Sequence, residues 1–133
     1  MKTYALDTNI ISYALNKNID IQRKILIESA NGNIFSIPPI VYYEIKRGLV
    51  RINAKTKLEY FDVFCKNFGV GSITPEMLDK AVEIHVDLSN KGTPIEDADI
   101  LIAAFCVVND YTLVTNNMAH FERVVGLTCV NWI

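Results

Sequence analysis

Four acidic residues lie far apart in a chain whose other segments are mostly apolar: Asp7, Glu44, Asp97 and Asp99. Each follows an apolar run or lies on a segment with helical spacing of apolar residues, where an unpaired carboxylate is costly unless a positive group binds it. Carboxylates without a cluster of cysteine or histidine favour a hard divalent cation, so Mg²⁺ or Mn²⁺ is the expected cofactor. The four acids are therefore candidate metal ligands.

Asp7 is the sharpest of these signals because an apolar, strand-like run stops at it and Thr8 and Asn9 follow. In open α/β sheets, ligands bind outside the carboxyl ends of the strands. We therefore expect Asp7 to point into the site.

Glu44 lies on an expected helix, with Ile40 and Gly48 one turn to either side. A glycine costs a helix about 1 kcal/mol relative to alanine, and close approach of a substrate or of another backbone beside Glu44 is one compensating reason. The alternative role for Glu44 is an ion pair with Lys46 or Arg47 on the same helix.

Asp97 and Asp99 are two positions apart, which places them about 200° from each other around a regular helix. Only one of them can then face a given point. Asp99 lies deeper in the apolar run and is one turn from Ala103, where a small side chain lets the helix approach the strand of Asp7. We expect Asp99 to be the ligand and Asp97 to complement the helix dipole in the first turn.

The elements that must position these acids alternate between strand and helix along the chain. Hydrophobic periodicity and turn residues predict strands at 2–6, 34–37, 70–73, 111–114 and 127–132, the last at a sheet edge. They predict helices at 10–16, 19–30, 39–51, 54–68, 76–90 and 95–109, with a helical turn at Phe121. Thr74 is the expected N-cap, Pro75 the first helical residue and Gly69 a helix stop. This order indicates an α/β fold with a mostly parallel sheet and right-handed crossovers.

Length and composition predict a single domain spanning residues 1–133, since half of the residues are hydrophobic. The three cysteines form no CxxC motif and are odd in number, so buried, reduced thiols are expected. There is no pattern of a signal peptide, and the longest apolar run, 100–108, is far shorter than the ~20 residues that span a bilayer. A cytoplasmic protein is expected. His85 and His120 have no acid at triad spacing and are expected to be surface or packing residues.

The net charge of −2 does not indicate nucleic-acid binding, but the distribution of the basic residues does. Five of the thirteen lie between positions 46 and 57: Lys46, Arg47, Arg51, Lys55 and Lys57. They could form an RNA-binding flank that contacts phosphates beside the acidic pocket, the candidates being Arg47, Arg51, Lys55 and Lys57. A solvated helix face is the alternative.

Several motifs in order along the chain resemble the PIN-domain ribonucleases, and within them the VapC toxins of toxin–antitoxin pairs. These motifs are LDTNIIS, VYYEIKRG, GTPIEDADILIAA, LVTNN, HFERVVGL and the closing NW. The resemblance implies a PIN-like α/β/α sandwich and Mg²⁺- or Mn²⁺-dependent cleavage of RNA, with metal-binding acids at Asp7, Glu44 and Asp99. It also implies a homodimer and a cognate antitoxin protein that blocks the site.

One departure from this family pattern concerns the residues after the strand at 111–114. Many relatives have a fourth acid there, whereas this chain has Asn116 and Asn117. Neutral amides hold a second cation less tightly, which disfavours a two-metal mechanism unless Asp97 supplies the charge. Asn9, Thr115 and Asn117 are accessory candidates, and Thr115 either positions a phosphate or water or simply caps its strand.

The expected reaction is hydrolysis of an RNA phosphodiester by a metal-activated water. Glu44 would complete the metal shell or act as general base. A phosphohydrolase that forms an aspartyl-phosphate on Asp7 is disfavoured, because that class usually has a second aspartate where this chain has Asn9. A binding module that has kept the fold without the activity is the other alternative.

Overall fold

The computed structural model describes residues 1–133 and contains one four-stranded sheet. The strands are β1 (Thr3–Leu6), β2 (Ile34–Ser36), β3 (Thr112–Val114) and β4 (Thr128–Val130). Their order is β2-β1-β3-β4, and all three pairings are parallel. The sequence-based prediction of an α/β fold with a parallel sheet is confirmed, including the position of the last strand at an edge.

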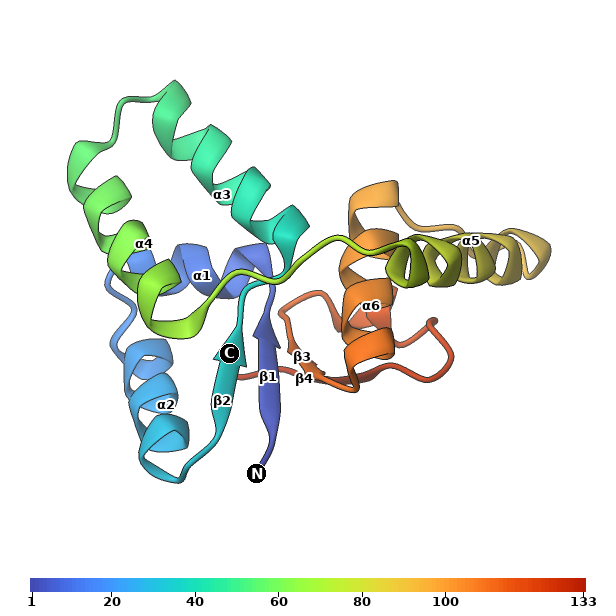
Figure 1. Cartoon of the computed structure of the whole chain (residues 1–133), viewed down its shortest axis with the longest axis horizontal. Helices are drawn as coiled ribbons and strands as arrows, with labels where there is room; N and C mark the ends of the chain where they lie inside the picture. The colour runs from blue at the N-terminus through green and yellow to red at the C-terminus, as the bar shows by residue number, and fades with distance from the viewer.

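Seven helices surround this sheet: α1 (Thr8–Leu15), α2 (Ile19–Ala30), α3 (Pro39–Arg51), α4 (Lys55–Phe68), α5 (Pro75–Asn90), α6 (Asp97–Asn109) and α7 (Met118–Phe121). In Figure 1, α2 and α4 lie on the left of β1 and β2, and α5 and α6 lie on the right. Helices α3 and α4 form a hairpin that projects beyond the carboxyl ends of the strands. None of the seven helices is both long enough and apolar enough to span a membrane.

The core explains why the two ends of the chain meet. The apolar residues of β1 and β3 are buried, and α6 adds a buried set on most of its circumference: Ile100, Ile102, Ala103, Ala104, Phe105 and Cys106. This burial is consistent with the prediction that the helix is apolar on nearly every side. Packing α6 against the sheet brings its N-terminal turn to the carboxyl end of β1, where Asp7 lies.

The predicted strand at 70–73 is wrong. Only one bridge, between Ile37 and Val70, connects this segment to the sheet, through the hydrogen bonds Ile37 N to Gly69 O and Gly71 N to Ile37 O. At Gly71 the backbone passes so close to the ring of Phe105 that a side chain would have no room. Val70 and Ile73 are exposed, so their apolar side chains do not indicate a buried strand.

Local capping signals were more informative. Thr74 caps α5 by accepting a hydrogen bond from Met77 N, and Pro75 is the first residue of that helix. Gly69 ends α4 with a φ of 82°, a backbone conformation that glycine adopts without strain. All three predictions are confirmed.

The three cysteines form no disulfide. Cys106 is buried, and Cys65 and Cys129 are half-buried. Burial raises the pKa of Cys65 to about 11 and raises the pKa of the other two thiols as well. These thiols are therefore protonated at neutral pH, as expected for packing residues.

Candidate active site

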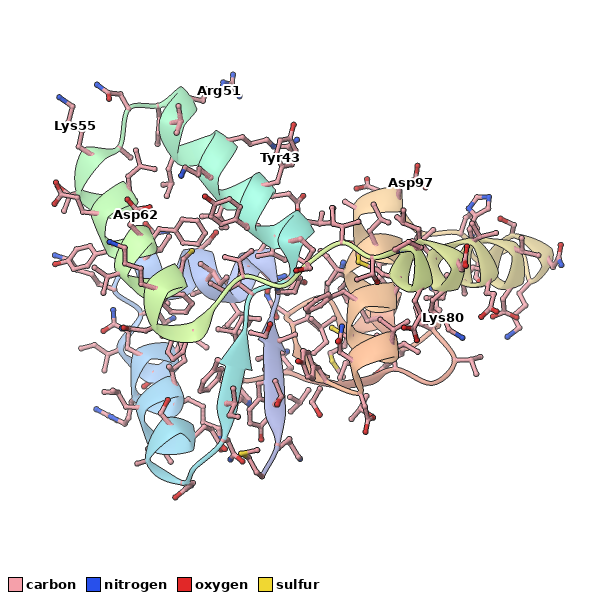
Figure 2. All side chains as sticks on the ribbon, in the orientation of Figure 1. Tyr43, Arg51, Lys55, Asp62, Lys80 and Asp97 are labelled. Carbon is pink, nitrogen blue, oxygen red and sulfur yellow. The ribbon has the colours of Figure 1, made fainter.

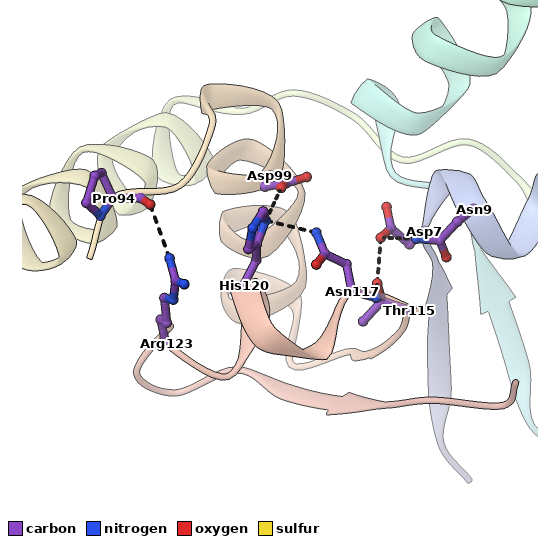
Figure 3. Close-up of polar contacts among 8 residues, drawn as sticks. All are labelled: Asp7, Asn9, Pro94, Asp99, Thr115, Asn117, His120 and Arg123. Atoms are coloured by element: carbon purple, nitrogen blue, oxygen red, sulfur yellow. Dashed lines mark hydrogen bonds and ion pairs between the residues drawn. The ribbon is translucent and has the colours of Figure 1, made fainter.

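Asp7 lies at the carboxyl end of β1 and is only 4% exposed. Its Oδ1 accepts a hydrogen bond from Thr8 N at 2.8 Å, because Asp7 is also the N-cap of α1. Its Oδ2 accepts from Thr115 Oγ1 at 2.7 Å and from Asn9 Nδ2 at 3.4 Å (Figure 3). Thr115 follows the last register pair of β1 and β3, Leu6 with Val114, so the sheet itself places the two side chains together.

The environment of Asp7 raises the pKa of its carboxyl group. Burial is the largest cause, and the negative charges of Asp99 and Glu44 raise the pKa further. The hydrogen bonds from Thr115 and Thr8 lower it in part. The site therefore holds a carboxylate whose ionised form is stabilised by local donors but disfavoured by its surroundings.

Glu44 lies on α3 and accepts a hydrogen bond at Oε1 from Thr8 Oγ1 at 2.9 Å. The alternative of an ion pair with Lys46 or Arg47 is wrong. Lys46 Nζ donates to Tyr42 Oη at 3.0 Å, and the Arg47 guanidinium lies 4.9 Å from the centre of the Tyr43 ring. Thr8 thus connects Glu44 to the residue that caps α1.

A cavity of about 180 Å³ lies beside Glu44 between α1 and α3, with Gly48, Ser12 and Lys57 among its lining residues. No atom lies within 4 Å of the place where a Cβ on Gly48 would be. No other segment of this chain therefore packs against Gly48, and the space beside it remains open to a substrate group.

Asp99 lies in the first turn of α6 and is partly buried, with 20% of its side chain exposed. Its Oδ2 is 3.2 Å from His120 Nδ1, which in turn is 2.9 Å from Asn117 Nδ2 (Figure 3). Asp97 is exposed and makes no side-chain hydrogen bond or ion pair; Figure 2 shows it at the outer end of α6. The two acids thus have different environments, as their spacing predicts.

His120 is the residue that sequence reasoning missed. His85 is exposed on α5, as expected for a surface residue, whereas His120 contacts Asp99, which the sequence did not predict. Twenty-one positions separate His120 from Asp99, so no local spacing connects them. The one usable signal was the position of His120 shortly after β3, at the same sheet edge as Asp7.

The accessory candidates lie in one hydrogen-bonded network around Asp7. Thr115 Oγ1 donates to Asp7 and accepts from Asn117 N at 2.9 Å. Asn9 Oδ1 accepts from Asn116 N at 3.1 Å. The network joins β1, β3 and α7, and through His120 it reaches Asp99.

The basic stretch divides into two parts. Arg47, Arg51 and Lys55 are exposed on α3 and at the start of α4, and Figure 2 shows Arg51 and Lys55 near the tip of this hairpin. Lys57 instead is half-buried, donates to Asn16 Oδ1 at 2.5 Å and lines the same cavity as Glu44. Arg47, Arg51 and Lys55 are therefore accessible to a polyanion in solvent.

The side chains of the site could bind a divalent cation only together with water. No three side chains of the His, Cys, Asp and Glu types lie together closely enough to hold one ion directly. Mg²⁺ in proteins usually binds through one or two carboxylates and keeps several waters, which this set can supply. No lysine or arginine forms an ion pair with Asp7, Glu44 or Asp99, so their negative charge has no basic side chain to balance it. The donor chemistry fits a hydrated divalent cation.

Known proteins resemble this chain in sequence and in fold. Residues 4–127 match the family described as PIN domain. The chain is 32% identical over 130 residues to Ribonuclease VapC2 of Rickettsia felis, with 97% of each chain covered. It is 25% identical over 134 residues to the tRNA(fMet)-specific endonuclease VapC of Salmonella typhimurium, with 99% of each covered. The crystal structure of VapBC2 from Rickettsia felis bound to a DNA fragment from its promoter superimposes with a TM-score of 0.91 and 28% identity, covering 98% of this chain and 99% of that chain.

Proposed function

This chain belongs to the PIN-domain family, and we propose that it is a Mg²⁺- or Mn²⁺-dependent endoribonuclease, the toxin of a toxin–antitoxin pair. One observation carries the proposal. Asp7, Glu44 and Asp99 come from a strand and two helices to the carboxyl end of a parallel sheet, where no lysine or arginine pairs with them. The ribonuclease names of the relatives support the same activity.

The residues of the site would have different roles in the hydrolysis. A bound divalent cation would neutralise the scissile phosphate and lower the pKa of a water molecule. Asp7 and Asp99 would hold it, directly or through water, and Thr115, Thr8 and Asn9 fix the carboxylate of Asp7. Glu44 is fixed at Oε1 by Thr8, and its Oε2 makes no hydrogen bond and is available to accept a proton or to complete the metal shell.

The exposed cations Arg47, Arg51 and Lys55 are proposed to contact RNA phosphates beside this site. They lie on the helix that carries Glu44 and at the start of the next one. Lys57 is proposed to contact a phosphate inside the cavity beside Glu44.

An antitoxin is the proposed protein partner, and an apolar groove of about 720 Å³ between α2 and α4 supports it. Large side chains in the groove are more than half exposed: Ile19, Leu26, Tyr60 and Val63. Leu15 lines both this groove and the cavity beside Glu44, so a partner segment in the groove can continue to the acids. An arginine of that segment would bind the carboxylates through charge-assisted hydrogen bonds and compete with the cation.

A homodimer belongs to the same proposal. Leu78, Val82 and Val86 lie one helical turn apart on α5 and are 46%, 62% and 49% exposed. A second copy would bury this stripe, and α5 is on the other side of the molecule from the α2–α4 groove (Figure 1). Light scattering of the purified chain, compared with a Val82→Glu variant, tests the dimer.

The central experiment measures RNA cleavage by the purified chain after EDTA treatment and after addition of Mg²⁺ or Mn²⁺. Cleavage is expected only with the cation and is expected to be lost in Asp99→Asn, while the exposed-acid control Asp20→Asn cleaves normally. Full cleavage by Asp99→Asn with unchanged metal dependence contradicts the site. No cleavage by the wild type with either cation favours an inactive binding module.

The partner is tested by co-expression with the short reading frame next to the gene. A stable complex with suppressed cleavage is expected, and an arginine-to-alanine change in the tail of the partner should restore cleavage. If the chain is harmless when induced alone and the neighbour neither binds it nor alters its cleavage, the toxin assignment fails even where the ribonuclease assignment survives.

A further inference from the structure

Two polar side chains, those of Asp99 and Asn117, contact the same atom, Nδ1 of His120. Asp99 Oδ2 lies 3.2 Å from it and Asn117 Nδ2 lies 2.9 Å from it (Figure 3). The three residues come from α6, from the loop after β3 and from α7. Nothing in the mechanism above uses the imidazole.

A neutral imidazole cannot satisfy both contacts at this atom. If Nδ1 carries the proton, it donates to Asp99 and the amide NH₂ of Asn117 faces another N–H group. If Nδ1 carries the lone pair, it accepts from Asn117 and the lone pair faces a carboxylate oxygen. When the Asn117 amide turns over, its Oδ1 replaces Nδ2. In the tautomer whose Nδ1 carries the lone pair, three electron-pair donors then converge: a carboxylate oxygen, an amide oxygen and an imidazole nitrogen.

The spacing of these atoms suits a metal ion. Ligand atoms at neighbouring positions around an octahedral ion, each about 2.1 Å from the metal, lie about 3 Å from each other. The two observed separations, 3.2 and 2.9 Å, bracket this value. The side chains of His120 and Asp99 are 40% and 20% exposed, so water can fill the remaining positions of the shell.

We infer that His120 is a metal ligand, and that Nδ1 of His120, Oδ2 of Asp99 and Oδ1 of Asn117 hold the divalent cation of this site. Asp7 then reaches the cation through water, since three donors already occupy its carboxylate and Thr115 ties it to Asn117. This arrangement has two protein ligands of the His and Asp types and one amide, consistent with the absence of a closely spaced set of three.

The imidazole has a consequence for metal preference. Oxygen ligands suit both Mg²⁺ and Mn²⁺, whereas a nitrogen ligand favours a transition-metal ion over Mg²⁺. The site is therefore selective for Mn²⁺. The inference rests on the proposed function only in placing the cation among these acids.

The test is the pulsed EPR spectrum of Mn²⁺ bound to the full chain, which detects ¹⁴N coupling only when a nitrogen ligates the ion. The chain has two histidines, so His85→Ala on the exposed face of α5 is a matched control for His120→Ala. We expect ¹⁴N modulation in the wild type and in His85→Ala and none in His120→Ala. Bound Mn²⁺ without ¹⁴N modulation in the wild type, or modulation that persists in His120→Ala, overturns the inference.

Titration calorimetry with MnCl₂ and with MgCl₂ gives a second readout. His120→Ala should weaken Mn²⁺ binding about ten- to a hundredfold, which is the usual cost of disturbing a metal shell, and should weaken Mg²⁺ binding less. His120→Glu should shift the preference towards Mg²⁺, because it supplies oxygen in place of nitrogen. Equal weakening of both ions in His120→Ala overturns the metal preference, and His120→Gln replaces the alanine variant if that variant does not fold.

The outcomes separate this inference from the ribonuclease proposal. Metal-dependent RNA cleavage by a wild-type protein whose bound Mn²⁺ shows no ¹⁴N modulation overturns the role of His120 alone. Clear ¹⁴N modulation in a protein that cleaves no RNA supports the role of His120 and overturns the ribonuclease proposal alone.

Discussion

The carboxylate of Asp7 and the cations of the α3–α4 hairpin differ in how firmly the fold holds them. Asp7 is buried and receives hydrogen bonds from a backbone amide, a hydroxyl and a side-chain amide. Arg47, Arg51 and Lys55 are exposed, and of the three only Arg47 has a side-chain partner, the ring of Tyr43. In a nuclease, the first arrangement fixes atoms for chemistry, and the second attracts a polyanion by charge without requiring fixed positions.

The largest effect on RNA cleavage is expected for Asp7→Asn, which removes the negative charge of the buried, hydrogen-bonded carboxylate. RNA cleavage should fall about a hundredfold, the upper end of the usual cost of losing a group that orients a metal shell. Single-turnover cleavage at saturating Mn²⁺ measures it, with Asp20→Asn as control. Cleavage within a few-fold of the wild type would remove Asp7 from the site.

For the same variant, Asp7→Asn, we also predict how the free energy of unfolding depends on pH. The pKa of Asp7 is raised above its ordinary value of 3.8, mainly by burial, so folding binds protons at this group. Its contribution to the free energy of unfolding is therefore greatest below pH 3.8 and is lost as the pH rises through the folded-state pKa. At pH 7 without metal, Asp7→Asn should melt at the same temperature as the wild type or higher, as calorimetry would measure. A clearly lower melting temperature at pH 7 that recovers in acid would contradict this sign.

A smaller effect is expected for Thr115→Val, which keeps the shape and removes the hydroxyl. Asp7 loses a donor and the amide of Asn117 loses its acceptor, so cleavage should fall about ten- to a hundredfold. The part-buried amide left without its acceptor should lower stability in urea denaturation by about 1 kcal/mol.

Thr112→Val is the matched control, because Thr112 is also a buried threonine of this strand region and its hydroxyl makes no hydrogen bond. It should cleave as fast as the wild type. Equal loss in both variants would mean that the strand, rather than the Thr115 hydroxyl, determines the rate.

The exposed cations should show a graded effect on binding. Replacing Arg47, Arg51 and Lys55 with alanine should reduce the slope of log affinity against log salt by about 2, since each phosphate contact on a single strand contributes about 0.7. Fluorescence anisotropy with a labelled RNA and Asp99→Asn as the background measures binding without cleavage. A variant lacking the exposed cations Lys2, Arg23 and Lys66 controls for net charge. An unchanged slope in the first variant would assign the hairpin to a solvated face.

The smallest effect is expected for Asp97→Asn. Asp97 is exposed, and an exposed charge acts through screened solvent, so cleavage should fall by no more than about threefold or the Mg²⁺ requirement should rise slightly. A metal titration of the cleavage rate measures it. Loss as complete as that of Asp99→Asn would mean that both carboxylates reach the cation.

The sequence predicted features that depend on adjacent residues, and it predicted contacts between residues that follow neighbouring parallel strands or begin the helices packed on them. The cap at Thr74 depends only on adjacent residues, and the convergence of Asp7 with Asp99 follows from packing an apolar helix on a parallel sheet. The helix after Asp7 starts two residues earlier than predicted, because Asp7 itself caps it.

The failures share a different origin. The 70–73 segment has the composition of a strand, but its pairing depends on the position of Phe105 in the folded chain. The contact between His120 and Asp99 depends on how α7 turns after β3, which no spacing encodes.

The hydrogen bond between Thr115 and Asp7 can form only after translation has reached the C-terminal part of the chain. It joins residues 108 positions apart, so the ribosome synthesises Asp7 and Glu44 long before Thr115, the partner of Asp7, exists. A chain released early, before β3, carries all three acids but lacks the strand that pairs with β1 and the hydroxyl that orients the carboxylate. Incomplete translation products of this gene should therefore be inert, and a damaged message yields no partial enzyme.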